Sequence, residues 1–302
     1  MKNLEYLFSE QATDIERMDF LLKMNERGIT SDDVAKLVEY LLPKDFPKMP
    51  GAIDICGTGG SKLPRINTST ISAFILAQKG IKIAKHGNRA SSGRFGSFDL
   101  LEALGFDIEK NADQLKNDFD KQNLAFIFAP KFFSALRHFA NVRKEIGVPT
   151  IFNILGPLLN PAQPQIQIIG TNSEKNAKLL IESCRKMKKK KVAIVTSKGG
   201  LDEIDISNDT IVFELNDGQI NDYIVSPEDF GIEKVDFNEI KGGDPEFNTK
   251  VTKDILRGNC DTQHKDLIYA NSAFCLFFMG QYNSMKEAFC DIYDEDFSKM
   301  IL

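Results

Sequence analysis

Apolar residues recur at helical spacing over the first forty positions of this chain. Ile15, Met18 and Leu22 return every three or four residues, which predicts an amphipathic helix. Gly28 is expected to end that helix, and Ser31 is expected to cap a second one. The chain therefore opens with a small helical region.

Three closely spaced prolines, Pro43, Pro47 and Pro50, then predict a linker, and beyond them short apolar runs alternate with helical stretches. Strands are expected at residues 52–56, 81–84, 124–128, 165–169 and 192–196. Helices are expected at residues 68–79, 97–104 and 135–146. Alternation of strands and helices is typical of a parallel sheet covered by helices.

The length of the chain bounds its domain organisation. A chain of 302 residues, 42% of them hydrophobic, can bury a full core. We expect an α/β fold whose large catalytic domain, residues 51–133 and 161–302, has a mainly parallel central sheet flanked by helices. Residues 1–46, joined by about 134–160, where the alternation is interrupted, are expected to form a small all-helical domain.

Three polar clusters stand where strands of the large domain are expected to end. They are a glycine loop (Gly57, Thr58, Gly59, Gly60), a hydroxyl-rich helix start (Asn67, Ser69, Thr70) and a basic turn (Lys85, His86, Asn88, Arg89). Ligands of open parallel sheets bind at this edge, glycine amides approach anions closely, and helix N-termini attract phosphate. The clusters together predict a site for a molecule with several phosphates.

The glycines alone would be better explained as an ordinary tight turn, but the Asn67-x-Ser69-Thr70 pattern that follows them favours phosphate binding. The loop is not a Walker P-loop, because the Gly-Lys-Ser/Thr ending is absent, and it is not G-x-G-x-x-G. One exposed helix end contributes only about 0.3–1 kcal/mol to anion binding, so several phosphates need further positive charge. Lys85, Arg89 and Arg94 are the candidates for that charge.

A second polar cluster lies far downstream. Asp202 and Glu203 follow the strand expected at 192–196 and a Gly199-Gly200 turn. Adjacent carboxylates suit Mg²⁺, a hard cation that prefers oxygen ligands. Taken alone, the pair is better explained as an ordinary acidic turn, and it becomes a metal site only if the fold places it opposite the glycine loop.

Charge and cysteine content narrow the function classes. The formal net charge of −5 argues against general nucleic-acid binding. The five cysteines form no C-x-x-C pair and no zinc-site spacing, so we interpret them as reduced thiols of a cytoplasmic protein. Neither a signal-peptide core nor an apolar run of 18 residues is present, so secretion and a membrane span are not expected. His138 and His264 are interpreted as structural, and the basic run at 185–191 as a solvated helix end.

The joint order and spacing of the motifs closely resemble those of anthranilate phosphoribosyltransferases. The resemblance runs from about residue 20 to residue 258. It rests on the segments Gly57-Thr-Gly-Gly60, Asn67-x-Ser69-Thr70, Lys85-His-Gly-Asn-Arg89, Gly96-Ser97, Val142-Arg-Lys-Glu-Ile-Gly147, Asn153-x-Leu-Gly-Pro157-Leu-x-Asn-Pro161 and Gly200-Leu-Asp-Glu203. It implies the nucleoside phosphorylase/phosphoribosyltransferase fold and a homodimer formed through the helical domain.

The resemblance also implies a reaction. The phosphoribosyl group of phosphoribosyl pyrophosphate (PRPP) would pass to the amine of anthranilate, with release of pyrophosphate, as a Mg²⁺-dependent step of tryptophan biosynthesis. The PRPP contacts it implies come from Gly57, Thr58, Gly59, Gly60, Ser61, Asn67, Ser69, Thr70, Lys85 and Ser97. The anthranilate contacts it implies come from Gly57, His86, Asn88, Arg143, Gly156 and Pro157, and the magnesium ligands from Ser69, Asp202 and Glu203. No residue is expected to act as acid or base, because the arylamine is neutral at pH 7.

Several positions depart from the family pattern. Ser61 stands where the glycine loop usually ends in Asp, Phe132 and Phe133 replace hydrogen-bonding residues, and Lys198 replaces a common His. These changes leave two alternatives open. One is a non-catalytic, nucleic-acid-binding relative of the same fold, and the other is a phosphoribosyltransferase or nucleoside phosphorylase acting on another aromatic or base substrate.

Overall fold

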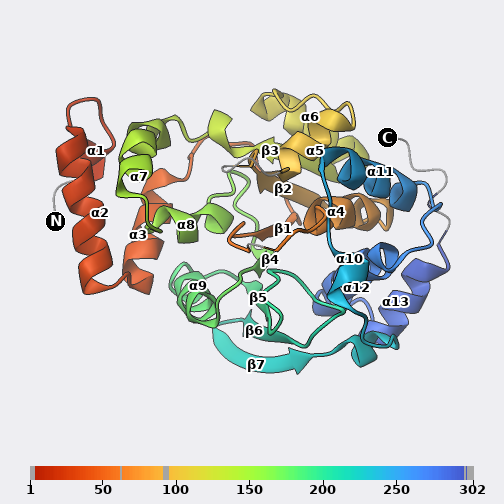
Figure 1. Cartoon of the computed structure of the whole chain (residues 1–302). Helices are drawn as coiled ribbons and strands as arrows, with labels where there is room; N and C mark the ends of the chain where they lie inside the picture. Colours follow the sequence, from red (N-terminus) through yellow and green to blue (C-terminus); the bar gives the residue numbers. More distant parts are fainter. Residues whose placement is uncertain (1–3, 62, 91–94, 296, 298–302) are drawn as a thin grey trace.

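The computed structural model describes residues 4–61, 63–90, 95–295 and 297. Its centre is one sheet with the strand order β3-β2-β1-β4-β5-β6-β7 (Figure 1). The strands are β1 (Ile53–Gly57), β2 (Ile83–Gly87), β3 (Leu124–Phe128), β4 (Ile166–Gly170), β5 (Lys191–Ser197), β6 (Thr210–Asn216) and β7 (Gln219–Val225). The first five pair in parallel, and β6 and β7 add an antiparallel edge. The expectation of a mainly parallel sheet is confirmed.

Helices cover both faces of this sheet (Figure 1). The α-helices are α1 (Leu4–Leu7), α2 (Asp14–Arg27), α3 (Ser31–Leu41), α4 (Thr68–Gln78), α5 (Ser97–Ala103), α6 (Ala112–Gln122), α7 (Ala140–Ile146), α8 (Phe152–Leu155), α9 (Glu174–Lys186), α10 (Phe237–Ile240), α11 (Pro245–Leu256), α12 (Gln263–Phe278) and α13 (Met285–Tyr293). None of the helices in the described part of the chain has the length and apolar character of a membrane span.

Two large apolar cores lie on opposite faces of the sheet. One joins α4, α5, α11, α12 and α13 to the strands, and the other joins α2, α3, α7, α8 and α9 to β4, β5 and β6. Helix α4 is buried on nearly every side, because it lies between the sheet and α12. The helix therefore lacks the polar face that a helix at the protein surface has.

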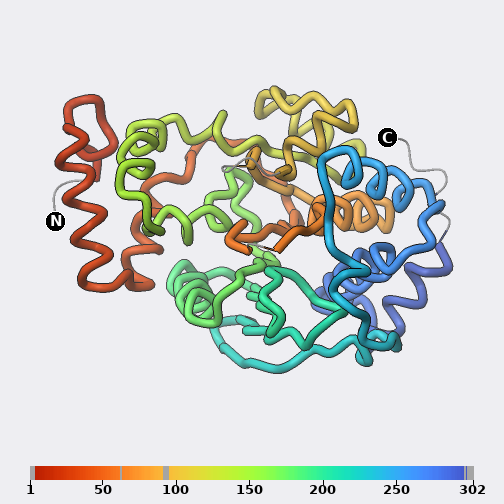
Figure 2. Tube along the Cα trace, in the orientation of Figure 1, coloured from red at the N-terminus to blue at the C-terminus, as the bar shows by residue number. Residues whose placement is uncertain are grey.

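The N-terminal helices lie at the opposite end of the molecule from α10–α13 (Figures 1 and 2). Helix α2 packs against α7, and α3 packs against α8 and α9. Both N-terminal helices begin with a capping box, in which Thr13 pairs with Glu16 and Thr30 with Asp33. The prediction that Ser31 is the cap of α3 was therefore wrong by one residue, because the Thr30 hydroxyl accepts the hydrogen bond from the Asp33 amide.

Some expected boundaries shift in the structure. Strand β2 begins and ends later than predicted, so Lys85 and His86 lie on the strand and not in a turn. The helix expected at 135–146 is a 3₁₀ segment, Ser134–Phe139, followed by α7. The basic run is not wholly solvated, because Lys189 is buried and donates to the Pro164 carbonyl at 2.6 Å. For Lys85, His86 and Lys189, a polar side chain that is hydrogen-bonded inside the fold had suggested a surface position.

Candidate functional site

The carboxyl ends of the parallel strands meet at one edge of the sheet. Gly57, the last residue of β1, pairs with Gly170 at the end of β4, which pairs in turn with Val195 on β5. The direction in which successive strands are added to the sheet reverses between β1 and β4. Strands β2 and β3 lie on one side of this point, and β5 lies on the other. In open α/β sheets such a switch point is where ligands bind.

The glycine loop and the Leu-Asp-Glu turn after β5 contact each other at this point. A Cβ atom placed on Gly57 would lie 2.9 Å from Asp202 Oδ2, so only glycine leaves room for that carboxylate. The Ser61 hydroxyl donates to the Gly200 carbonyl, 139 positions further along the chain, at 3.0 Å, and the Asn172 amide donates to the Gly60 carbonyl at 2.6 Å. The two distant segments therefore meet, which is the condition under which the acidic pair was expected to belong to a site.

Lys85 carries the positive charge beneath the loop. Its side chain is almost fully buried, and its ammonium donates to the Ile55 carbonyl at 2.7 Å and to Ser69 Oγ at 3.0 Å. Burial lowers the pKa of Lys85, although the nearby Asp54 carboxylate opposes that shift. The hydrogen bond to Ser69 connects the predicted basic residue to the hydroxyl-rich start of α4.

The two acidic residues are enclosed. Burial, aided by Asp205 and opposed by Arg65, raises the pKa of Glu203 to about 7. Its Oε1 atom is buried without a hydrogen-bond partner among the described residues, and Arg65 forms an ion pair with Asp202. Two neighbouring carboxylates with an unpaired oxygen fit a hard divalent cation, so this pair meets the chemical requirement for Mg²⁺. Ser69, the third expected ligand, is instead hydrogen-bonded to Lys85.

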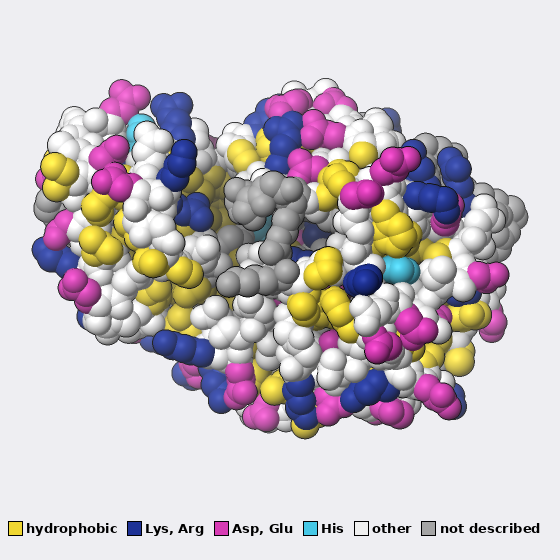
Figure 3. Space-filling view, in the orientation of Figure 1, with side chains coloured by type: hydrophobic (Ala, Val, Ile, Leu, Met, Phe, Trp, Pro, Cys, Tyr) yellow, Lys and Arg dark blue, Asp and Glu magenta, His cyan; other side chains and the backbone are white. Residues whose placement is uncertain are grey.

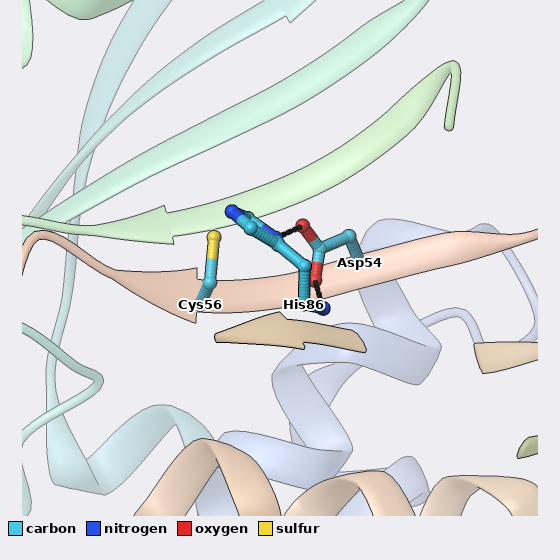
Figure 4. A group of neighbouring side chains, drawn as sticks. All are labelled: Asp54, Cys56 and His86. Atoms are coloured by element: carbon cyan, nitrogen blue, oxygen red, sulfur yellow. Dashed lines mark hydrogen bonds and ion pairs between the residues drawn. The ribbon is translucent and has the colours of Figure 1, made fainter. Parts of the chain in front are cut away.

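His86 is held from both sides of its ring. Nδ1 lies 2.7 Å from Asp54 Oδ2 (Figure 4). On the other side of the ring, Nε2 lies 2.7 Å from the Gly156 carbonyl oxygen. Gln167 donates to the same Asp54 oxygen and to the Pro157 carbonyl, both at 3.2 Å. The backbone carbonyls of residues 156 and 157 are therefore held by side chains of β2 and β4.

Cys56 lies beside this pair, and its thiol with Asp54 and His86 forms a compact cluster (Figure 4). Burial and the Asp54 carboxylate raise the pKa of Cys56 well above its usual value. A protonated thiol is neither a nucleophile nor a good metal ligand. Since Asp54 and His86 are already bonded to each other, we interpret the cluster as structural.

Other expected residues form their contacts outside the loop. Ser97 and Asn88 are neighbours at the start of α5, where Ser97 Oγ donates to the Asn88 carbonyl at 3.4 Å. Arg143 lies on α7, with its guanidinium over the Phe152 ring, 5.4 Å from the ring centre. Arg89 pairs with Glu102 at the surface. Among the described residues, neither arginine forms a hydrogen bond or an ion pair with the glycine loop.

The remaining residues differ in accessibility. Thr70 is completely buried, whereas Gly57, Gly59 and Gly60 are exposed and Asn67 is partly exposed. Arg94 lies outside the described residues. Figure 3 shows the surface hollowed between the lobe that contains α1–α3 and α7 and the body that contains the sheet, with Lys and Arg side chains on both sides of the hollow. Positive charge is therefore present beside this hollow.

Sequence reasoning missed several residues of this site. Asp54 and Gln167 are polar side chains inside apolar strands, and both are completely buried. A charged residue within a predicted buried strand is the signal that could have identified Asp54. Arg65 and Asn172 left no such signal, because each lies in a loop where polar residues are common.

Comparison with known proteins agrees with this geometry. Residues 49–295 match the family model described as glycosyl transferase family, a/b domain. A curated anthranilate phosphoribosyltransferase from Dictyoglomus thermophilum is 40% identical over 283 residues, covering 93% of this chain and 84% of that protein. Its counterpart from Persephonella marina is 38% identical over 293 residues, covering 95% and 86%.

Solved structures extend the agreement to the fold. Anthranilate phosphoribosyltransferase (TrpD) from Thermus thermophilus has a TM-score of 0.85 at 29% identity, covering 97% of this chain and 88% of that chain. The Saccharomyces cerevisiae enzyme in complex with PRPP and Mg has a TM-score of 0.86 at 25% identity, covering 97% and 85%. Sequence identity of this level over most of both chains shows that the protein belongs to the anthranilate phosphoribosyltransferase family.

Proposed function

We propose that this protein transfers the phosphoribosyl group of PRPP to the amine of anthranilate and releases pyrophosphate. The observation that carries the proposal is the contact between the glycine loop and the Asp202–Glu203 turn, with Lys85 beneath. Amide donors, a buried ammonium and a carboxylate pair are what a magnesium pyrophosphate requires. The relatives that cover most of the chain carry the same activity in their names.

The chain's own residues would act by binding and positioning. The glycine loop and the start of α4 would hold the phosphates, and Lys85 would stabilise the negative charge that develops on the departing pyrophosphate. When bound at Asp202 and Glu203, Mg²⁺ would neutralise further phosphate charge. A ribosyl transition state has oxocarbenium character, so the chain needs to orient the amine and exclude water and does not need a strong base.

Anthranilate would lie on the side of residues 156 and 157. His86 would act through its hydrogen bond to the Gly156 carbonyl, because both of its ring nitrogens already have partners. Arg143 would bind the carboxylate as a planar fork, and Asn88 would lie along the path of the ring.

Residues 1–46 with about 134–160 would form a small helical domain that closes on the large one. The contacts of α2 with α7 and of α3 with α8 support this division. The finer expectations belong to the same proposal: a homodimer through the helical domain, a place in tryptophan biosynthesis and a cytoplasmic location.

A fluorescence assay of anthranilate consumption tests the proposal. Anthranilate should be consumed when PRPP and Mg²⁺ are both supplied, with one pyrophosphate released for each anthranilate consumed. Omission of either PRPP or Mg²⁺ should stop the reaction. Purified, folded protein that binds neither PRPP nor anthranilate would contradict the proposal.

The alternative is nucleic-acid binding by a non-catalytic relative, which Ser61 and the Phe132-Phe133 pair favour. The net charge of −5 counts against it. Mobility of labelled DNA and RNA at low salt separates the two functions, because binding driven by phosphate contacts is strong there and weakens as salt rises. We expect no shift in mobility.

A further inference from the structure

Arg65 lies inside the candidate magnesium site, on the segment between the glycine loop and α4. Its guanidinium forms an ion pair with Asp202, whose side chain is completely buried, while Arg65 itself keeps 26% of its side-chain surface exposed. A buried carboxylate needs a counter-charge or hydrogen bonds to remain ionised. The side chain of Arg65 supplies that charge within the chain itself.

The backbone of Arg65 is held in place by the C-terminal part of the chain. Gly242 donates to the Pro64 carbonyl at 3.1 Å, and the Asn248 side chain donates to the Arg65 carbonyl at 3.4 Å. A Cβ atom on Gly242 would lie 2.2 Å from the Arg65 carbonyl carbon, so this close approach requires glycine. The guanidinium therefore extends from a fixed point.

Arg65 lies close enough to Glu203 and to Lys85 to interact electrostatically with both. A cation at this place favours ionised carboxylates and repels the neighbouring ammonium, and it would repel a divalent metal ion in the same way.

We propose that Arg65 is the built-in counterion of the Asp202–Glu203 pair, which a divalent cation must displace in order to bind. This inference rests on the proposed function. A displaced guanidinium needs another anion, and the pyrophosphate group of the substrate provides one. Metal and phosphorylated substrate therefore bind cooperatively, each tightening the other by the same factor.

Titration with Mn²⁺ alone, followed by electron paramagnetic resonance, tests the counterion role. Arg65→Gln should bind Mn²⁺ at least tenfold more tightly than the wild type in the absence of PRPP. Arg185→Gln is the matched control, because Arg185 pairs with Glu182 at the surface, and it should bind as the wild type does. The double variant Arg65→Gln/Asp202→Asn should lose this increase in Mn²⁺ affinity. That loss would show that the increase depends on the Asp202 carboxylate.

Cooperativity gives an independent readout. PRPP should tighten Mn²⁺ binding by a larger factor in the wild type than in Arg65→Gln, because only the wild type has a guanidinium to release. Mn²⁺ binding by Arg65→Gln that is equal to or weaker than that of the wild type would overturn the inference. Damage to the fold cannot imitate the expected result, since it would weaken metal binding.

A second measurement tests the same inference without Arg65→Gln, in case that variant fails to fold. The arginine side-chain NMR signal of Arg65, identified by its loss in Arg65→Lys, should shift when Mg²⁺ and PRPP are added together. An unchanged signal while PRPP binds would overturn the counterion role. If the wild type does not consume anthranilate but Arg65→Gln still binds Mn²⁺ more tightly than the wild type, only the proposed function is overturned.

Discussion

Lys85 shows what a single residue contributes when the fold removes it from water. Within the described part of the chain its ammonium donates to a carbonyl and to a hydroxyl, and both partners are neutral. An ammonium without a direct carboxylate partner retains its attraction for an incoming anion. Burial strengthens that attraction, because the effective dielectric constant is lower inside the protein.

Replacement of Lys85 by Ala should therefore reduce kcat by about 10²- to 10³-fold, the usual effect of removing one preorganised charge-stabilising donor. Pyrophosphate release measures the effect, and circular dichroism checks that the fold is intact. Arg89→Ala serves as the control, because Arg89 pairs with Glu102 at the surface. Equal losses in both variants would count against the assigned role of Lys85.

Arg143 is expected to act on binding and not on the chemical step. Arg143→Ala should raise the KM for anthranilate by about tenfold or more, since a charge-assisted bond to a carboxylate is worth about 1.5–3 kcal/mol. The kcat and the KM for PRPP should change little. Steady-state kinetics with each substrate varied in turn separates these effects, and an unchanged KM for anthranilate would remove Arg143 from the site.

Among the secondary-structure elements, the strand ends show the tightest packing. Gly170 ends β4 where the Asp202 backbone crosses it, and a Cβ atom there would lie 1.7 Å from the Asp202 carbonyl oxygen. The turn after β5 can approach β1 only because both facing strands end in glycine. Close packing of this kind fixes the carboxylates opposite the loop.

Gly170→Ala should therefore destabilise the protein by about 3 kcal/mol, the upper range for overpacking, and displace the Asp202–Glu203 turn. Urea unfolding measures the change. Gly156→Ala is the comparison, because no atom lies within 4 Å of the added methyl group and its backbone is already helical. That variant should remain within about 1 kcal/mol of the wild type.

The start of α3 provides a pH-dependent element. Burial alone would raise the pKa of Asp33, but hydrogen bonds from Arg27 and Thr30 outweigh it and lower the pKa to about 2. The unfolded value is about 3.9, so the stabilisation is fully present above pH 4 and is lost as the pH falls toward 2. The effect should amount to about 1–2 kcal/mol at pH 7.

Asp33→Asn tests this directly. Its free energy of unfolding should be lower than that of the wild type at pH 7, and the difference should narrow between pH 4 and pH 2.5. Denaturation curves at several pH values measure the difference. Asp19→Asn, which removes an exposed i,i+4 ion pair with Lys23, should show little effect at any pH.

For the whole molecule, the apolar core around α2, α3, α7 and α8 is continuous with the sheet through α9 and β5. The helical lobe is therefore attached to the body by packing as well as by the chain. The hydrogen bonds from His86 and Gln167 to residues 156 and 157 join the two at the candidate site. Ligands bound between them should stabilise both parts together.

Thermal unfolding with and without ligands checks this expectation. PRPP with Mg²⁺ at about 100 times its Kd should stabilise the fold by about 2.7 kcal/mol. Mg²⁺ alone should have a much smaller effect, because Arg65 already neutralises Asp202. Two separate transitions, of which only one responds to the ligands, would show that the parts unfold independently.

Much of this architecture followed from the order of residues along the chain. Short apolar runs that alternate with helical stretches predicted a mainly parallel sheet covered by helices. The spacing of apolar residues within each element specifies which of its faces is buried. The polar motifs at Gly57, Lys85 and Asp202 follow from the same pattern, since ligands bind where parallel strands end. The boundaries of β2 were less accurate, because Lys85 and His86 are paired inside the fold, and the helix expected at 135–146 begins as a 3₁₀ segment.

Tertiary structure alone decided which charges meet. Arg65 pairs with Asp202 across 137 positions, and His86 joins Asp54 to residue 156, although no local pattern connects these residues. The antiparallel edge formed by β6 and β7 and the contact of Gly242 with Arg65 are of the same kind. Sequence spacing specifies local conformation and burial, whereas ion pairs and close backbone approaches depend on the way in which distant segments pack.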